Sequence, residues 1–164
     1  MLNMCLKGNA MRDANITDIK HMIDLSVENS IIDNIFTINL SVYEKNLAYA
    51  ILNQHYHIGV ELIKVFTDNT DNIIAYTWAN ITTMPWTTDK IVNIQMVDID
   101  LTVPPRNRIQ IIKQMMKCWE DFAMKANANI ICSATSRKNQ NAFLKLHEKN
   151  GYEIRGSFAY KKLF

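Results

Sequence analysis

The spacing of apolar and polar positions predicts four helices. Asn15 stands three positions before Asp18, and Ser41 stands three before Glu44; a capping side chain followed by a carboxylate at this spacing is typical of a helix start. Apolar residues recur at helical spacing after each pair and in two later segments. Gly151 ends the last helix because glycine readily adopts the left-handed conformation. The predicted helices span residues 15–28, 41–54, 106–126 and 140–150.

Strands are predicted where β-branched and aromatic residues gather or where apolar and polar residues alternate. The longest, residues 90–103, ends at Pro104 because proline donates no hydrogen bond to a strand ladder. Its alternation places two sets of residues on opposite faces, Ile91, Asn93 and Gln95 against Val92, Ile94 and Met96. The other predicted strands are residues 6–12, 58–66, 73–82, 129–135, 152–154 and 157–163.

These elements predict an α/β fold. A strand, a helix and a strand in succession over residues 90–135 imply a parallel pair with a right-handed crossover, whereas the hairpins imply antiparallel neighbours. We therefore expect a mixed, mostly antiparallel sheet with a central parallel strand pair and four flanking helices. At 164 residues the chain is expected to form one domain, residues 1–164.

Composition excludes several classes of protein. With 48% apolar and 21% charged residues the chain resembles an ordinary globular domain, and no apolar run reaches the ~18 residues that a membrane-spanning helix needs. The first residues lack the basic and apolar regions of a secretory signal, so we expect a cytoplasmic protein. The three cysteines lie far apart and fit neither a disulfide framework nor a zinc site, so no metal is expected.

Charge is divided unevenly along the chain. Residues 1–104 carry 6 Lys and Arg against 12 Asp and Glu, a net −6, whereas residues 105–164 carry 12 against 4, a net +8. A basic half attracts a polyanion such as a nucleotide or an anionic partner, although a solvated basic face is the alternative. A nucleic acid is the less favoured partner because no aromatic residues are regularly interleaved with the basic ones.

Two segments resemble the GNAT acyltransferases, and the order of the predicted elements is similar over nearly the whole chain. Residues 142–152 look like that family's fourth helix running into its Gly-Phe step, with Asn139 or Asn141 near the usual asparagine. Residues 11–19 look like its first strand and helix start. The resemblance implies a single GNAT-like domain that takes an acyl group from acyl coenzyme A, typically acetyl-CoA, and passes it to an amine acceptor.

The resemblance also implies where the coenzyme lies. In the family, acyl coenzyme A occupies the gap between two splayed strands, and N–H groups of a glycine-rich loop at the start of the next helix hold its pyrophosphate. The expected glycines fall here near Arg108, Gln110 and Ile112, and no glycine is present. The coenzyme-binding residues implied by this match are Thr102, Val103, Arg106, Asn107, Arg108, Ile109, Gln110 and Asn139.

Two interpretations of this altered loop stay open. In the first, Arg106 and Arg108 replace the glycine contacts by charge-assisted hydrogen bonds to phosphate, with Lys113, Arg137 and Lys138 adding to the field. In the second, the bulky side chains fill the cleft and the fold serves as a structural module.

His147 stands where the resemblance places the family's acid, commonly a tyrosine, four residues before Gly151. An imidazole can donate a proton to a leaving thiolate. The alternative is a surface histidine that is stabilised at a helix C-terminus by the helix dipole.

Candidate bases lie on two predicted strands. Asp98 and Asp100 are two positions apart and are expected to share a face, where a carboxylate could take a proton from the amine. The alternative is a pair of solvent-facing acids. Glu61, within an otherwise apolar strand, is a second candidate. Either Thr102 or Val103 would supply the backbone N–H that faces the acyl oxygen.

Two functions of different classes follow. One is an acyl-CoA-dependent N-acyltransferase. The other is an inactive GNAT-like structural or assembly protein, such as a phage virion component whose partners are other virion proteins. The 18 asparagines and 22 isoleucines are compatible with that origin, since A+T-rich genomes favour both residues.

Overall fold

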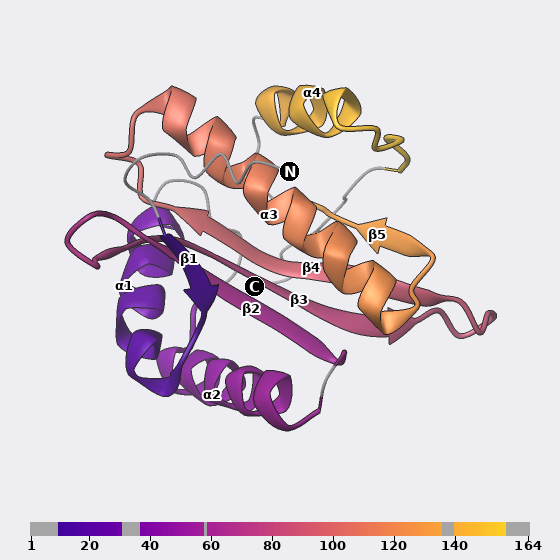
Figure 1. Cartoon of the computed structure of the whole chain (residues 1–164), viewed down its shortest axis with the longest axis horizontal. Helices are drawn as coiled ribbons and strands as arrows, with labels where there is room; N and C mark the ends of the chain where they lie inside the picture. The colour runs from indigo at the N-terminus through magenta and orange to yellow at the C-terminus, as the bar shows by residue number, and fades with distance from the viewer. Residues whose placement is uncertain (1–9, 31–36, 58, 136–139, 157–164) are drawn as a thin grey trace.

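In the computed structural model the described residues are 10–30, 37–57, 59–135 and 140–156. They contain one five-stranded sheet in the order β1-β2-β3-β4-β5 (Figure 1). The strands are β1 (Ala10–Asp13), β2 (Glu61–Thr67), β3 (Ile73–Thr83), β4 (Lys90–Ile99) and β5 (Ile130–Cys132). All neighbours are antiparallel except β4 and β5, which are parallel. The predicted mixed, mostly antiparallel α/β sheet is confirmed, with the parallel pair at one edge of the described sheet.

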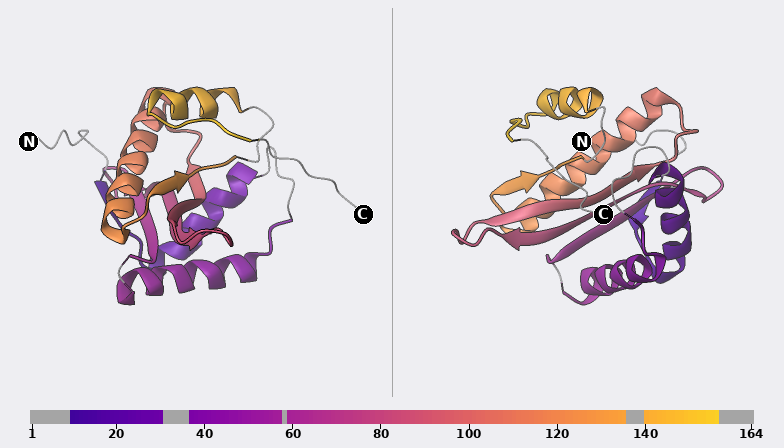
Figure 2. Two further views of the ribbon diagram at one scale, coloured as in Figure 1. Left: turned by 90° about the vertical axis from the view of Figure 1, so that its right-hand side faces the viewer. Right: turned by 180° about the vertical axis from the view of Figure 1, so that it is seen from behind.

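Within the described ranges four helices flank the sheet, as predicted. They are α1 (Ile19–Ser30), α2 (Leu40–Tyr56), α3 (Pro105–Ala126) and α4 (Asn141–Lys149), and a 3-10 turn, Ile16–Asp18, precedes α1. The helices α1 and α2 cover one face of the sheet, whereas α3 lies across the other face with α4 beside it (Figure 2). None of the described helices combines the length and the apolar character needed to cross a lipid bilayer.

Each face of the sheet has its own apolar core. The core under α3 is centred on Phe66, Val92 and Trp119, which are at most 1% exposed. The core under α1 and α2 is centred on Met22 and Leu47, which are fully buried. Strands buried on both faces explain why β2 and β3 are rich in apolar residues rather than strictly alternating.

The first helix starts where the sequence predicts. The Asn15 side chain accepts a hydrogen bond from Thr17 N at 2.9 Å, and Asn15 N donates to Asp18 Oδ2 at 2.8 Å, which completes a capping box. The predicted start of the second helix at Ser41 is wrong. Asn39 caps it instead, because its side-chain oxygen accepts from Val42 N at 3.1 Å.

Strand β4 differs from the prediction in two ways. It ends at Ile99 rather than residue 103, because Asp100 Oδ1 accepts a hydrogen bond from Thr102 N at 2.7 Å and turns the chain. Gln95 is unpaired between Met96 and Ile94, which face Trp78 and Ala79 of β3. This β-bulge reverses the alternation, so Met96 packs with the α1–α2 core while Ile94 packs with the α3 core.

A further prediction is corrected. Residues 152–154 do not form a strand, because Tyr152 N donates back to His147 O and Gly151 N to Glu148 O. With Gly151 at φ 84°, these bonds form a Schellman motif that closes α4. The predicted strand over residues 157–163 lies outside the described residues.

Candidate functional site

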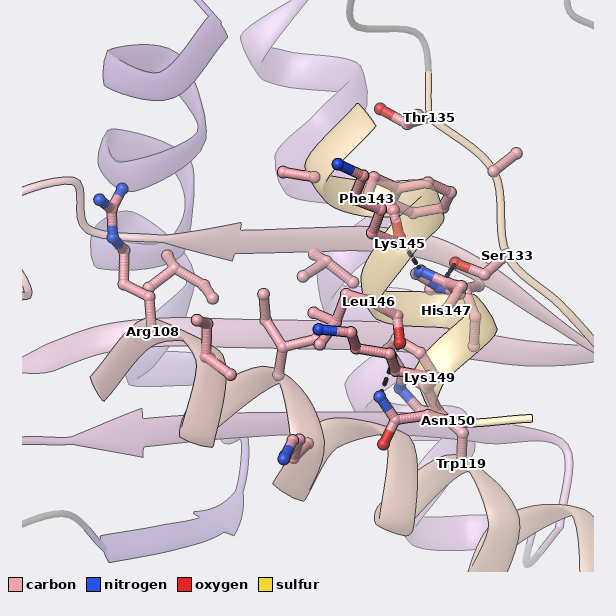
Figure 3. A pocket seen from close by; sticks show the side chains of 18 of the residues that line it. Arg108, Trp119, Ser133, Thr135, Phe143, Lys145, Leu146, His147, Lys149 and Asn150 are labelled. Atoms are coloured by element: carbon pink, nitrogen blue, oxygen red, sulfur yellow. Dashed lines mark hydrogen bonds between the residues drawn. The ribbon is translucent and has the colours of Figure 1, made fainter. Parts of the chain in front are cut away.

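The parallel strands β4 and β5 are paired over only three residues, and a cavity opens where the pairing ends. The pairs run from Ile91 with Ile130 to Asn93 with Cys132, just before the bulge at Gln95. Beyond that point a cavity of about 710 Å³ is lined by the second half of β4, residues 133–135, and side chains of α3 and α4 (Figure 3). This is where the resemblance places a gap between two strands.

The cavity has mostly apolar walls. Ile112 and Trp119 of α3 and Phe143 and Leu146 of α4 line it. Trp119 is fixed in place because it is 1% exposed and its Nε1 donates to Thr77 Oγ1 at 3.0 Å. Such a surface suits a flexible, largely apolar ligand arm.

Four cationic side chains line the same cavity. Arg108 and Lys113 come from α3, and Lys145 and Lys149 come from successive turns of α4. Among the described residues that line the cavity there is no carboxylate. None of the four cations forms an ion pair with another described residue. The cavity therefore favours an anionic ligand.

His147 lies in the wall of the cavity and is 3% exposed, which excludes the alternative of a solvent-exposed helix-end histidine. Its Nδ1 lies 2.9 Å from Phe143 O and its Nε2 lies 3.1 Å from Ser133 Oγ. A carbonyl oxygen can only accept, so this pairing assigns the proton to Nδ1 and leaves Nε2 to accept from Ser133. Burial lowers the pKa of His147, although the hydrogen bond to Phe143 opposes this in part.

The candidate bases do not line the cavity. Asp98 points to the opposite face of β4, where it is buried and accepts hydrogen bonds from Ser26 and Asn29 of α1. Asp100 lies beyond the end of the strand, so the expectation that both aspartates share a strand face is wrong. Glu61 accepts from Trp78 Nε1 at 2.7 Å, and burial raises its pKa although that hydrogen bond opposes the shift.

Of the implied coenzyme-binding residues, Arg108 and Ile109 line the cavity. Five others that the structure describes do not: Thr102, Val103, Arg106, Asn107 and Gln110. Asn139, Arg137 and Lys138 lie outside the described residues.

Backbone donors are scarce at the start of α3. Pro104 and Pro105 carry no N–H, and the N–H groups of Asn107 and Arg108 both donate to Pro104 O, at 2.9 and 3.0 Å. Just before the helix, Thr102 N donates to Asp100 Oδ1 and Val103 N donates to Asp100 O. Few backbone N–H groups at the start of α3 are therefore free to bind an anion.

Sequence reasoning missed several residues of this cavity, among them Lys145, Lys149 and Ser133. The pair Lys145 and Lys149 carried a usable signal, since residues four apart share a helix face. Ser133 carried none, because only the folded chain brings the residue after β5 next to His147.

The sequence matches no family model, and no curated protein is similar to it in sequence. Solved structures are similar in fold. A predicted acetyltransferase from Clostridium acetobutylicum, solved with acetyl-CoA, has a TM-score of 0.71 at 16% identity over 94% of this chain and 96% of its own. The aminoglycoside antibiotic 6'-N-acetyltransferase of Acinetobacter baumannii has a TM-score of 0.69 at 16% identity over 94% of this chain and 97% of its own. Glucosamine-6-phosphate N-acetyltransferase of Arabidopsis thaliana has a TM-score of 0.67 at 15% identity over 95% of this chain and 99% of its own. The chain has the fold of the GNAT acetyltransferases.

Proposed function

We propose that this chain is an N-acyltransferase that binds an acyl coenzyme A, in the first instance acetyl-CoA, in the cavity between β4, α3 and α4. The observation that carries the proposal is the lining of that cavity: mostly apolar walls with four cations and no carboxylate among the described residues. Coenzyme A joins a flexible, uncharged arm to a phosphorylated nucleotide, and a lining of apolar walls with four cations suits both parts. The fold supports the same function, since a similar structure was solved with acetyl-CoA.

Of the two interpretations of the loop without glycine, this lining supports replacement of the glycine contacts by cations. Arg108 and Lys113 line the cavity and are our candidates for holding phosphate groups, joined by Lys145 and Lys149 from α4. Arg106 is exposed and lies outside the lining, so it is not among the candidates for holding the coenzyme.

Asp98 is our candidate for the group that takes a proton from the amine acceptor. Its carboxylate is buried, and among the described residues a chain of hydroxyls leads away from it: the Tyr43 hydroxyl hydrogen-bonds to Ser26 and Tyr76, and both of these contact Asp98. Tyr43 is half-buried at the outer end of this chain of hydroxyls. Asp100 we assign to the turn after β4.

The test is a calorimetric titration with acetyl-CoA of the wild type, of Arg108→Ala combined with Lys113→Ala, and of Arg106→Ala. Each phosphate contact by a cationic side chain contributes about 1.5–3 kcal/mol, so losing both weakens binding at least 100-fold. Arg106→Ala is the control, since it removes one positive charge from the same turn of α3 as Arg108 but outside the cavity, and it should bind like the wild type. Absence of binding to the wild type at millimolar acetyl-CoA would contradict the proposal.

A second candidate function, an assembly protein without activity, is supported by the outer surface of α2. Val42, Tyr49 and Tyr56 recur every seven residues, and together with Leu52 they are 47–71% exposed. Apolar residues at this spacing form the contact stripe of paired helices. Two results together would establish this function instead. The wild type would not bind acetyl-CoA, and it would form a complex in analytical ultracentrifugation that the Tyr49→Lys variant does not form.

A further inference from the structure

Lys145 and Lys149 of α4 form a pair of positive charges in the lining of the cavity. They stand four residues apart, so they share one face of the helix, and both side chains are exposed. Figure 3 shows this pair on α4 and Arg108 on α3, where Arg108 belongs to the first turn. The cavity therefore offers two separate places to negative charge, one on each helix.

The charge of this lysine pair is not neutralised within α4. Glu148 is the one acidic residue of that helix, and it neither lines the cavity nor forms an ion pair with another described residue. The helix dipole favours a cation in the last turn, which explains Lys149 but not a second lysine one turn earlier. Like charges at this spacing repel each other, so an anion bound between the two lysines would stabilise the helix.

The cations of the two helices differ in chemistry as well as in place. Arg108 is half-buried, and its planar guanidinium, with Lys113 further along α3, suits the two linked phosphates of a pyrophosphate. Lysine carries a compact charge on a flexible stem, which suits a terminal phosphate that needs no fixed geometry. Each phosphate of a pyrophosphate diester carries one negative charge, whereas a phosphomonoester carries about 1.5 to 2 at neutral pH. Each pair of cations therefore matches the charge of one of these groups.

We propose that Lys145 and Lys149 bind the 3′-phosphate of coenzyme A and so select this donor over thioesters that lack the phosphate; this rests on the proposed function, since it takes the donor to be an acyl coenzyme A in this cavity. Coenzyme A carries that monoester on its ribose, at the end away from the thioester, and its pyrophosphate lies between the two. Because both lysines are exposed, they can reach a group at the solvent end of the bound coenzyme while its arm lies among the apolar walls. Arg108 and Lys113 are left to the pyrophosphate.

The experiment compares two donors that differ in this phosphate alone, acetyl-CoA and 3′-dephospho-acetyl-CoA, by calorimetric titration of the full chain. The wild type should bind the dephosphorylated donor about 10- to 100-fold more weakly, because charge-assisted contacts with two exposed cations are lost. In Lys145→Ala combined with Lys149→Ala the two donors should bind equally. Their common affinity should be the one that the wild type has for the dephosphorylated donor.

Three further variants assign the effect to these two lysines. Arg108→Ala should weaken the binding of both donors and keep the ratio of their affinities, because both donors carry the pyrophosphate. Lys145→Arg combined with Lys149→Arg keeps both charges and should still favour acetyl-CoA. Lys20→Ala combined with Lys125→Ala removes two exposed charges outside the cavity lining, so both affinities should stay close to those of the wild type. Circular dichroism of each variant checks that the fold is kept.

The two donors distinguish failure of this phosphate site from failure of the proposed function. If the wild type binds both donors equally well, Lys145 and Lys149 do not select the coenzyme, and coenzyme binding still stands. If the wild type favours acetyl-CoA and the double alanine variant favours it to the same degree, another group binds the 3′-phosphate and its assignment to these lysines is wrong. If neither donor binds at millimolar concentration, the proposed function fails and the phosphate site fails with it.

Discussion

The Asp98 carboxylate accepts a hydrogen bond of 2.6 Å from Ser26 Oγ, across the sheet face opposite the cavity. Asn29 Nδ2 and the Tyr76 hydroxyl also donate to it, at 3.0 and 3.1 Å. Burial raises the pKa of Tyr76 well above its usual value, so this hydroxyl keeps the proton that it donates. Asp98 therefore joins α1 to β3 and β4 within a buried polar network.

Replacing Asp98 with alanine is expected to destabilise the fold by about 2–4 kcal/mol, because buried donors on Ser26 and Asn29 lose their acceptor. The measurement is the free energy of unfolding from urea titration. Asp100→Ala is the control, since it removes a carboxylate two residues away that caps only the turn at Thr102, and its expected cost is about 1 kcal/mol or less. Equal losses from both variants would show that the network does not stabilise the fold.

The Arg12–Asp18 pair should make stability depend on pH in acid. Burial alone would raise the pKa of Asp18, but hydrogen bonds from the Arg12 side chain at 2.7 Å and from Asn15 N outweigh it, so the pKa is lowered. A carboxyl with a lowered pKa contributes stability above its unfolded pKa of about 3.9 and loses it as pH falls through the folded value.

The expected result is that the stability difference between the wild type and Asp18→Asn is constant above about pH 4 and shrinks below it. Thermal midpoints measured from pH 2 to 7 test this. Asp24→Asn makes the same substitution on the exposed side of α1 and should leave stability close to that of the wild type. A constant difference down to pH 2 would rule out the shift.

His147 should make the free energy of unfolding depend on pH in a second range, at higher pH than Asp18 does. Its lowered pKa means that the unfolded chain, with a pKa of about 6.5, binds the proton first as pH falls. The contribution to stability is therefore complete above pH 6.5 or so and declines below it. Unfolding free energies of the wild type and His147→Gln between pH 5 and 8 should converge as pH falls, and the imidazole should titrate below its usual pKa by NMR.

Tyr152 has a buried hydroxyl without a hydrogen-bond partner among the described residues. Burial raises its pKa to about 12, and the nearby Glu120 adds to this. Tyr152→Phe removes an unsatisfied polar atom and keeps the ring against His147, so stability should be unchanged or higher by up to about 1 kcal/mol. Absorbance during alkaline titration should lose a tyrosine that titrates near pH 12. A clear loss of stability would point to a partner for this hydroxyl outside the described residues.

Local patterns were enough to predict most of the fold. The capping box of Asn15 and Asp18 and the left-handed Gly151 involve residues at most four apart, so each reads directly from the chain. The amphipathic stripes of α1, α2 and α3 likewise follow from spacing. The errors occurred where two local signals competed, as when Asn39 rather than Ser41 capped α2, or where a side chain turned the backbone, as Asp100 does.

The features of the site likewise fall into those that the sequence predicts and those that it does not. The sequence by itself determined the element order, the helix caps and the basic second half of the chain, because these depend on neighbouring residues and on composition. The tertiary structure decided which of the basic residues line the cavity and which face of β4 carries Asp98. It also decided that Ser133 meets His147. One unpaired residue, Gln95, reverses which side chains of β4 face the cavity. The cavity opens where the pairing of β4 with β5 ends, at Cys132. Both features depend on how two strands pair, so the spacing of residues along one strand does not reveal them.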